Sequence, residues 1–124
     1  MIAGDSTLHM IKNKGNTLYE RLNKFGSEAR KMLDKKFAGD VITTGAGSLF
    51  LTHFLKGKIC EIKNATDAAK CNTKKLYDYH FHMIANDKIF FLPGKLGAFS
   101  DVHTNSDITA IMKSTDNFLT KFKK

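Results

Sequence analysis

Several residue types are scarce in this chain, and each scarcity narrows the class of protein. Tryptophan is absent, proline occurs once, at Pro93, and the cysteines are Cys60 and Cys71 alone. Two cysteines are too few for the disulfide framework of a small secreted domain, and no signal peptide precedes them. No apolar run approaches the roughly 20 residues that span a bilayer. We therefore expect a reduced, cytoplasmic protein without a membrane partner.

Arginine is also scarce. The formal net charge is +8, but of the 20 basic residues only Arg21 and Arg30 are arginines. Base readout and bidentate phosphate recognition favour the planar guanidinium group over the ammonium of lysine. The lysines therefore indicate a solvated surface, and we do not expect a nucleic-acid partner. The alternative that stays open is a basic interaction module that binds nucleic acid or a protein partner.

Periodic apolar residues predict three long helices and a short helical segment before the first. In chain order these are Ser6–Asn13, Thr17–Phe37, Thr73–Asn86 and the stretch from Thr104 to the C-terminus. The apolar face of the first long helix comprises Leu18, Leu22, Phe25, Ala29, Met32, Leu33 and Phe37. Gly15 and Gly39-Asp40 are its start and stop signals. Thr104 and Asp107 stand where a helix N-cap and its third residue belong.

Short runs rich in β-branched and aromatic residues predict the strands. They are Val41–Thr44, Ser48–Leu55, Ile89–Leu92 and Gly97–Val102, with Ile59–Lys63 as a further short edge. Gly45-Ala46-Gly47 joins the first two by a bend or bulge, and Pro93-Gly94 separates the last two. The continuous apolar run Ile89–Leu92 indicates a buried strand.

The predicted order is helix, two strands, helix, two strands, helix. Few strands with helices between the hairpins favour an α+β fold, with a small antiparallel or mixed sheet of about four strands and helices on one face. A length of 124 residues suits one domain with one core. We therefore predict a single domain over residues 1–124.

No motif for catalysis or metal binding is completed. His80 and His82 are two residues apart, so on a helix they point about 200° away from each other and cannot share a tetrahedral ion. Gly45-Ala46-Gly47-Ser48 completes neither the dinucleotide-binding pattern nor the P-loop pattern. No spacing identifies a Ser-His-Asp set or an activated cysteine. The residues alone identify no catalytic residue, no metal site and no cofactor-binding motif in this chain, but among so many lysines a Schiff-base lysine stays open, because no pattern singles one out or excludes it. The remaining histidines are expected to be surface or hydrogen-bonded groups: His9, His53 and His103.

Short motifs follow one another along nearly the whole chain. They are Met1-Ile2-Ala3-Gly4 with Ser6-Thr7-Leu8, Leu18-Tyr19-Glu20-Arg21-Leu22, Gly47-Ser48-Leu49-Phe50, Phe91-Leu92-Pro93, Ala98-Phe99-Ser100, His103-Thr104 and Asp107-Ile108. In this order and spacing they resemble the last third of class III aminotransferases, which are fold-type I enzymes that use pyridoxal phosphate. The branch they resemble most is glutamate-1-semialdehyde 2,1-aminomutase, an isomerase of tetrapyrrole precursor synthesis.

The resemblance implies a C-terminal small domain that closes over an active site. In that family a large domain holds pyridoxal phosphate and its Schiff-base lysine, and those elements would lie N-terminal to Met1. We therefore expect the isolated chain to be inactive and to contribute to an aminotransferase or aminomutase only as a part. The expected partners are the large domain of the parent enzyme and, in a homo-oligomer, further copies. A small domain without its large domain is expected to expose an apolar face.

The resemblance also draws attention to the loop after Pro93. The aminomutases carry a glutamate near the substrate in an F-E-A motif, whereas Pro93–Phe99 is two residues shorter and has no acid. This difference predicts another amino donor or acceptor for the parent enzyme. The residues expected to face a substrate in the assembled enzyme are Pro93, Lys95 and Gly97, of which only Lys95 is charged. The alternative is that Pro93 and Gly97 only shape a turn.

Overall fold

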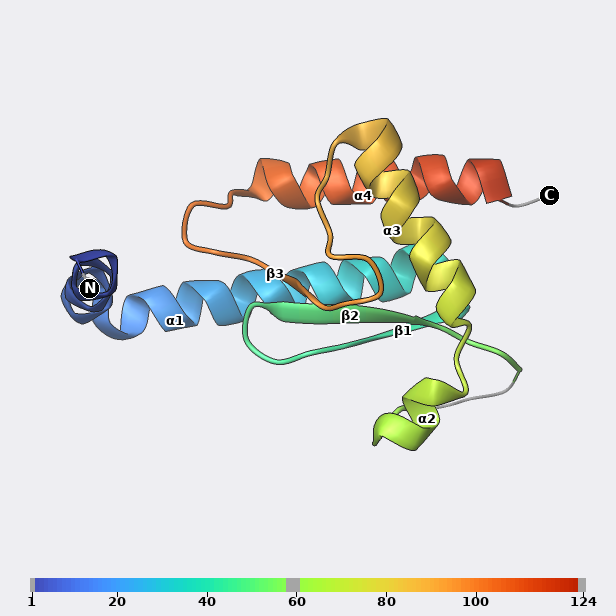
Figure 1. The fold of residues 1–124 in the computed structure, drawn as a ribbon, viewed down its shortest axis with the longest axis horizontal. Coiled ribbons are helices and arrows are strands. Elements are labelled where there is room, and N and C mark those ends of the chain that lie inside the picture. The colour runs from blue at the N-terminus through green and yellow to red at the C-terminus, as the bar shows by residue number, and fades with distance from the viewer. Residues whose placement is uncertain (1, 58–60, 123–124) are drawn as a thin grey trace.

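The computed structural model describes residues 2–57 and 61–122, and Figure 1 shows their arrangement. The elements are α1 (Ile2–Phe37), β1 (Val41–Thr44), β2 (Leu49–Phe54), α2 (Ala65–Ala69), α3 (Thr73–Asp87), β3 (Gly97–Ala98) and α4 (Asn105–Phe122). In Figure 1, α1 and α4 run across the picture and α3 crosses at a steep angle. None of the helices in these residues is both long and apolar enough to cross a bilayer. The predicted α+β class is confirmed.

Two helical segments make up α1, and they meet at Gly15. This glycine has φ 55° and ψ −143°, a conformation that residues with a Cβ rarely adopt. The segment before Gly15 turns away from the rest of α1 and is seen nearly end-on in Figure 1. The predicted break ahead of Thr17 is therefore confirmed, although the first segment is longer than Ser6–Asn13.

The second segment of α1 packs a narrow strip of side chains into the core. Its buried apolar residues lie four or seven positions apart: Leu18, Phe25, Ala29, Leu33 and Phe37. Met32 was predicted for the same face but is exposed. At about 100° per residue, Met32 lies at one edge of this strip, just beyond Phe25 and farthest from Phe37. The helix ends as predicted, with Gly39 at φ 95°.

An antiparallel hairpin of β1 and β2 forms most of the sheet, with Val41 opposite Phe54 and Thr44 opposite Leu51. Residues 45–48 close this hairpin, so the predicted bend or bulge is a turn between paired strands. β3 pairs with the start of β2 and completes a three-stranded antiparallel sheet in the order β1-β2-β3. Within the described residues the sheet has three strands where about four were predicted.

The predicted strand Ile89–Leu92 is wrong. Lys88 ends α3 in a left-handed conformation with φ 56°, and the Ile89 N–H donates to the Met83 carbonyl at 3.1 Å. The chain is thereby turned off the sheet, and no strand of the described residues pairs with this segment. Phe91 points inward and is buried, while Phe90 on its other side is exposed. The prediction that the whole run Ile89–Leu92 is buried is therefore wrong as well.

The predicted strand Gly97–Val102 is confirmed only at its first two residues. Beyond β3 a local turn satisfies the backbone: the Ser100 N–H donates to Nδ1 of His103 at 2.9 Å, and the His103 N–H donates to the Ser100 carbonyl at 3.2 Å. Val102 consequently lies on the surface. Of the short edge predicted over Ile59–Lys63, residues 61–63 are not a strand, and the first two residues, Ile59 and Cys60, lie outside the described residues.

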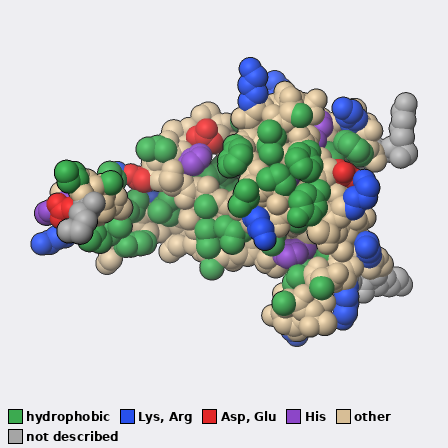
Figure 2. Space-filling model, in the orientation of Figure 1, with side chains coloured by type: hydrophobic (Ala, Val, Ile, Leu, Met, Phe, Trp, Pro, Cys, Tyr) green, Lys and Arg blue, Asp and Glu red, His purple; other side chains and the backbone are tan. Residues whose placement is uncertain are grey.

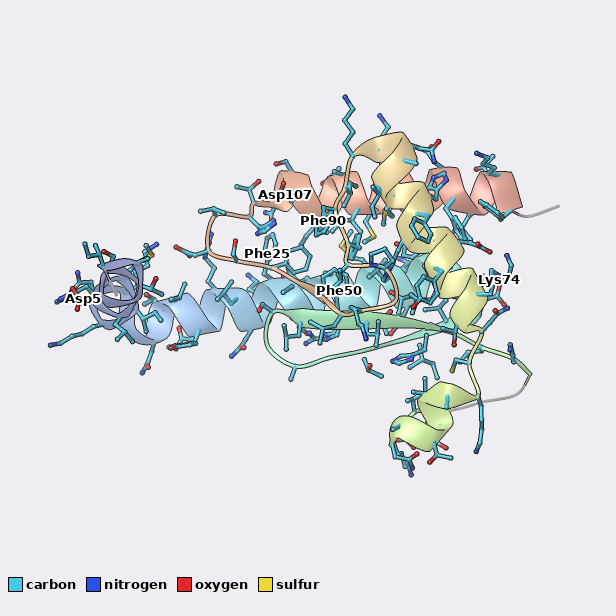
Figure 3. The ribbon with its side chains drawn as sticks, in the orientation of Figure 1. Asp5, Phe25, Phe50, Lys74, Phe90 and Asp107 are labelled. Atoms are coloured by element: carbon cyan, nitrogen blue, oxygen red, sulfur yellow. The ribbon has the colours of Figure 1, made fainter. Side chains whose placement is uncertain are left out.

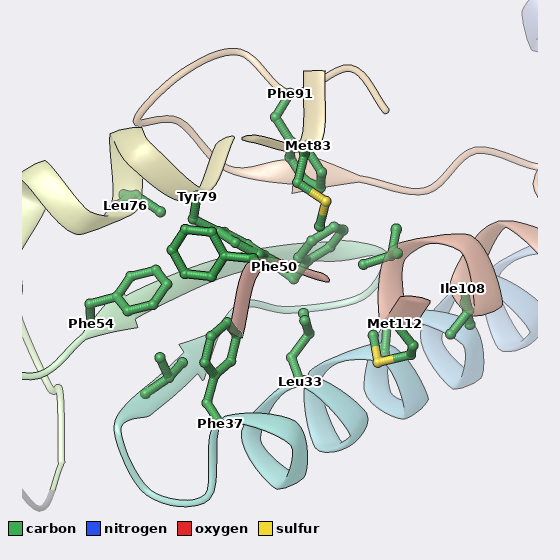
Figure 4. Packing of buried hydrophobic residues seen from close by; sticks show 14 of the residues in the cluster. Leu33, Phe37, Phe50, Phe54, Leu76, Tyr79, Met83, Phe91, Ile108 and Met112 are labelled. Carbon is green, nitrogen blue, oxygen red and sulfur yellow. The ribbon is translucent and has the colours of Figure 1, made fainter. Parts of the chain in front are cut away.

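The core lies between one face of the sheet and the three long helices. Five strand residues are buried on this face: Val41, Thr43, Phe50, Thr52 and Phe54. α1 packs against β1 and β2, α3 packs against β2, and α4 packs against α1 and α3. Figure 4 shows Phe37 of α1 close to Phe54 of β2 and Tyr79 of α3, with ring centroids 5.1 and 5.5 Å from that of Phe37. The helices thus cover one face of the sheet, as predicted.

Thr104 and Asp107, which were predicted to cap the last helix, form half of a capping box at the start of α4. The Asp107 carboxylate accepts the Thr104 backbone N–H at 2.6 Å and the Thr104 hydroxyl at 3.1 Å. The backbone bond from Thr104 is the main reason that the pKa of Asp107 lies below its usual value. The Asp107 N–H donates to the Thr104 carbonyl at 3.0 Å instead of to the hydroxyl. These bonds hold Asp107 in place at the start of α4, where it lines the groove described next.

Candidate functional site

A groove opens between the segment that follows α3, strand β3 and the first turns of α4. Its volume is about 560 Å³. Apolar residues form most of its walls, among them Phe50, Phe90, Phe91, Leu96, Phe99 and Ile111. Lys88, His103 and Asp107 add polar groups. Figure 3 shows Phe50, Phe90 and Asp107 reaching this region from three separate parts of the chain. An apolar hollow with a few polar groups is typical of sites that receive a ligand or a partner side chain.

The loop beside the groove, residues 92–97, is fixed by contacts to α3. The Gly94 N–H donates to Nδ1 of His80 at 3.1 Å. His80 also stacks on Phe91, with ring centroids 4.8 Å apart and planes inclined by 16°. Gly94 has φ 71° and lies so close to Tyr77 that a Cβ would come within 2.7 Å of its ring. These contacts place Phe91 in the core and leave its neighbours on the surface.

Burial of His80 makes the attachment of this loop dependent on pH. Desolvation disfavours the charged imidazole and lowers the pKa of His80 from 6.5 to about 4. In the unfolded chain the same imidazole takes up its proton near pH 6.5. Between these two values the unfolded state binds more protons than the folded state. The free energy of unfolding should therefore fall as the pH is lowered from 6.5 to 4, by about 3 kcal/mol.

Urea unfolding measured across this pH window, with and without His80→Asn, tests the expectation. Asparagine can still accept the Gly94 N–H but does not titrate, so the variant should lose most of the decline in this range. His9→Asn, at an exposed position on the first segment of α1, should keep the full decline. An unchanged slope in His80→Asn would show that other groups cause the loss of stability.

The three residues predicted to face a substrate lie at different places around the loop. Pro93 is half-buried in its turn with Gly94, and Lys95 is exposed. Gly97 belongs to β3 and is the only one of the three among the described residues that line the groove. A Cβ on Gly97 would come within 2.6 Å of the Phe50 ring and 2.7 Å of the Phe91 ring. Close packing therefore accounts for Gly97 without a substrate.

His80 and His82 are both buried in α3 but face different neighbours. The His82 ring lies against Phe118, with centroids 5.6 Å apart, and its Nε2 is 3.7 Å from Oδ2 of Asp87. His80 instead contacts the loop at Gly94. In residues 2–57 and 61–122, no group of three His, Cys, Asp or Glu side chains is arranged to hold a metal ion. His53, predicted as a surface or hydrogen-bonded group, bonds through Nε2 to the Thr44 hydroxyl at 2.8 Å.

The glycine-rich loop 45–48 packs against α1. Nη1 of Arg30 donates to the carbonyl of Gly47 at 2.9 Å and to that of Leu49 at 2.7 Å. A phosphate-binding loop presents backbone N–H groups to its ligand. Here a carbonyl of the loop and one at the start of β2 accept from a guanidinium group of the same chain. Its role is to join the hairpin to the helix.

Large apolar side chains gather on the surface around loop 92–97. Five of them, all exposed, form what we call the apolar face: Tyr77, Phe81, Phe90, Leu92 and Leu96. Figure 2 shows hydrophobic side chains clustered over the region of α3 and the segment that follows it. An exposed apolar face was expected, but no sequence motif indicated its position. The signals were the spacing of Tyr77 and Phe81 by four on a helix and the alternation of Phe90, Phe91 and Leu92.

Comparison with known proteins gives a likeness of fold. No protein-family model and no curated protein matches the sequence. Fifteen chains of solved structures match. One is a novel β-phenylalanine aminotransferase from Variovorax paradoxus, with a TM-score of 0.71 and 24% identity over 82% of this chain and 23% of that chain. The chain thus has the fold of part of an aminotransferase and spans about a quarter of that enzyme's length.

Proposed function

We propose that this chain is the small domain of a class III aminotransferase that depends on pyridoxal phosphate. In the assembled enzyme it closes over an active site held by a large domain, and it is not catalytic alone. The observation that carries the proposal is the combination of an aminotransferase fold over 82% of the chain with the ordered motifs that end in His103-Thr104 and Asp107-Ile108. Two independent properties, backbone shape and residue pattern, therefore support the same family.

The exposure of the lysines in the described residues supports a Schiff-base lysine that belongs to the large domain and not to this one. A Schiff-base lysine works in an apolar pocket that lowers its proton affinity. None of the lysines in the described residues is buried, and the lysine nearest the groove, Lys88, lies at its exposed edge. These residues do not fit an attachment site for pyridoxal phosphate. The cofactor, which supplies an electron sink for an amino substrate when bound, would then be held by the large domain.

Within the family we propose a parent enzyme related to glutamate-1-semialdehyde 2,1-aminomutase but with another amino donor or acceptor. The order of motifs supports the relation. The loop after Pro93 supports the difference, because it has no acid and presents Lys95 as an exposed cation. In this proposal Pro93, Lys95 and Gly97 lie on the side of the domain that faces the large domain and its substrate in the closed enzyme.

The proposal is tested by comparing this chain with the longer polypeptide encoded when upstream coding sequence is included. The longer polypeptide should bind pyridoxal phosphate, show an imine absorbance that borohydride removes, and transfer amino groups. The 124-residue chain should do none of these. Trapping of the cofactor on a lysine of the 124-residue chain would contradict the proposal. Salt-dependent retention on DNA at physiological ionic strength would instead favour a basic nucleic-acid-binding module.

A further inference from the structure

The apolar face extends from α3 across the loop that follows it. Phe90 is 78% exposed, Leu92 58% and Leu96 52%. Tyr77 and Phe81 on α3 extend the surface, since their rings are stacked with centroids 6.3 Å apart. Tyr77 also touches the loop at Gly94, so the two parts are contiguous. Exposed apolar surface of this kind marks a site of interaction.

The exposure is built into the fold. Phe91 and Phe99 on either side of the loop are buried, and the two rings contact Phe50 at centroid distances of 5.7 and 5.0 Å. The hydrogen bond from Gly94 to His80 holds the middle of the loop on α3. With these points attached, the intervening apolar side chains have no space in the core. A surface held in one conformation loses little entropy when a partner binds.

The groove beside the apolar face has room for side chains of that partner. It is about 560 Å³ in volume, with Phe50, Phe91 and Ile111 in its walls. Phe90, Leu92 and Leu96 belong both to its lining and to the apolar face. An anchoring aromatic or aliphatic side chain in such a hollow, surrounded by a flatter apolar contact, is the usual centre of a protein interface.

The charges around this surface decide which partner it fits. Lys88 and Lys95 flank it, and neither forms an ion pair within residues 2–57 and 61–122. The carboxylate that lines the groove, Asp107, already accepts two hydrogen bonds from Thr104. A second copy of this chain would bring another basic rim and another net charge of +8 to the contact. Electrostatic complementarity therefore favours an acidic partner over a second copy.

We propose that the apolar face and the groove form a docking surface for an apolar protein surface that is bordered by carboxylates. Those carboxylates pair with Lys88 and Lys95, and an apolar side chain of the partner enters the groove. This assignment of the partner rests on the proposed function: the partner surface belongs to the large domain, which holds the cofactor. Closure of the small domain would then bury the five residues of the apolar face.

Two synthetic helical peptides serve as probes of this surface. They share one face of Leu and Phe, and their other face carries only Glu in the first peptide and only Lys in the second. Fluorescence anisotropy measures the affinity of the 124-residue chain for each. The Glu peptide should bind at least about tenfold more tightly than the Lys peptide, and Leu92→Ser combined with Leu96→Ser should weaken it by about tenfold or more. Leu8→Ser, on the exposed first segment of α1, should have no effect.

A charge exchange separates docking from general attraction. Lys88→Glu with Lys95→Glu should reverse the preference between the peptides. Lys12→Glu with Lys31→Glu, at exposed positions outside the apolar face, changes the net charge equally and should keep the preference for the Glu peptide. All variants replace exposed side chains, and circular dichroism checks that their fold is retained.

The proposal is overturned if neither peptide binds, or if both charge exchanges alter the preference equally. It is also overturned if the chain forms dimers in sedimentation that the Leu92→Ser and Leu96→Ser pair abolishes, because the occupant would then be a second copy. Peptide binding requires no cofactor and no activity. If the longer polypeptide is active but neither peptide binds the 124-residue chain, only the docking surface is disproved. If the Glu peptide binds as expected but the longer polypeptide is inactive, only the proposed function is disproved.

Discussion

Gly26→Ala should lower the free energy of unfolding by about 3 kcal/mol, a large effect for the addition of one carbon atom. Gly26 lies in α1 directly against the hairpin loop. A Cβ there would stand 2.1 Å from the carbonyl oxygen of Gly47 and 2.9 Å from Cα of Ser48. Both are backbone atoms, so no change of rotamer relieves the clash. Arg30 holds the Gly47 carbonyl at 2.9 Å, and moving the loop away would break that hydrogen bond as well.

Urea denaturation followed by circular dichroism measures this loss. The matched control is Gly4→Ala, also in α1, where a Cβ would meet no atom within 4 Å. Alanine favours a helix over glycine, so this variant should be no less stable than the wild type. Equal stabilities of the two alanine variants would mean that the loop yields without cost and that the contact does not hold α1 on the hairpin.

Phe118→Ala should lower the free energy of unfolding by about 4 kcal/mol, because it opens a cavity at the point where α3, α4 and β2 meet. Phe118 has no exposed surface. Its ring lies 5.1 Å from that of Tyr79, 6.1 Å from that of Phe54 and 4.5 Å from that of Phe122, measured between centroids. These neighbours come from α3, β2 and α4, and none can fill the space without leaving its own contacts.

The same denaturation experiment includes Phe90→Ala as the control. It removes the same side chain from a position that is 78% exposed and should change stability by no more than about 0.5 kcal/mol. If Phe118→Ala unfolds even without denaturant, Phe118→Leu should give a measurable, smaller loss. A cost for Phe118→Ala similar to that of Phe90→Ala would contradict the position of Phe118 in the core.

The helices were predictable from the sequence because their signals are local. The second segment of α1, α3 and α4 carry apolar residues at the helical period, and Gly15 and Gly39 interrupt that period where the structure does. Val41–Thr44 was predicted with its observed bounds because β-branched residues and a following glycine-rich turn are also local signals. The motifs that suggested an aminotransferase are likewise read directly along the chain.

The segment after α3 was mispredicted because its structure depends on distant contacts. An apolar run such as Ile89–Leu92 is compatible with a buried strand, and only the absence of a pairing partner in the described residues and the turn at Lys88 reveal otherwise. The same contacts turn Phe90 and Leu92 outward and create the apolar face. For this reason the candidate groove could not be predicted from the sequence, although several of its residues lie within the two strands predicted over Ile89–Leu92 and Gly97–Val102.

The sequence by itself determined the α+β class, the order of the main elements, the break at Gly15 and the resemblance to an aminotransferase small domain, because periodicity, turn residues and motifs are properties of neighbouring residues. Tertiary structure alone decided which apolar residues are buried and which are left for a partner. That choice depends on space in the core: Phe50 and Gly97 admit Phe91, the His80 bond holds Gly94 on α3, and the remaining apolar side chains of the loop lie on the surface.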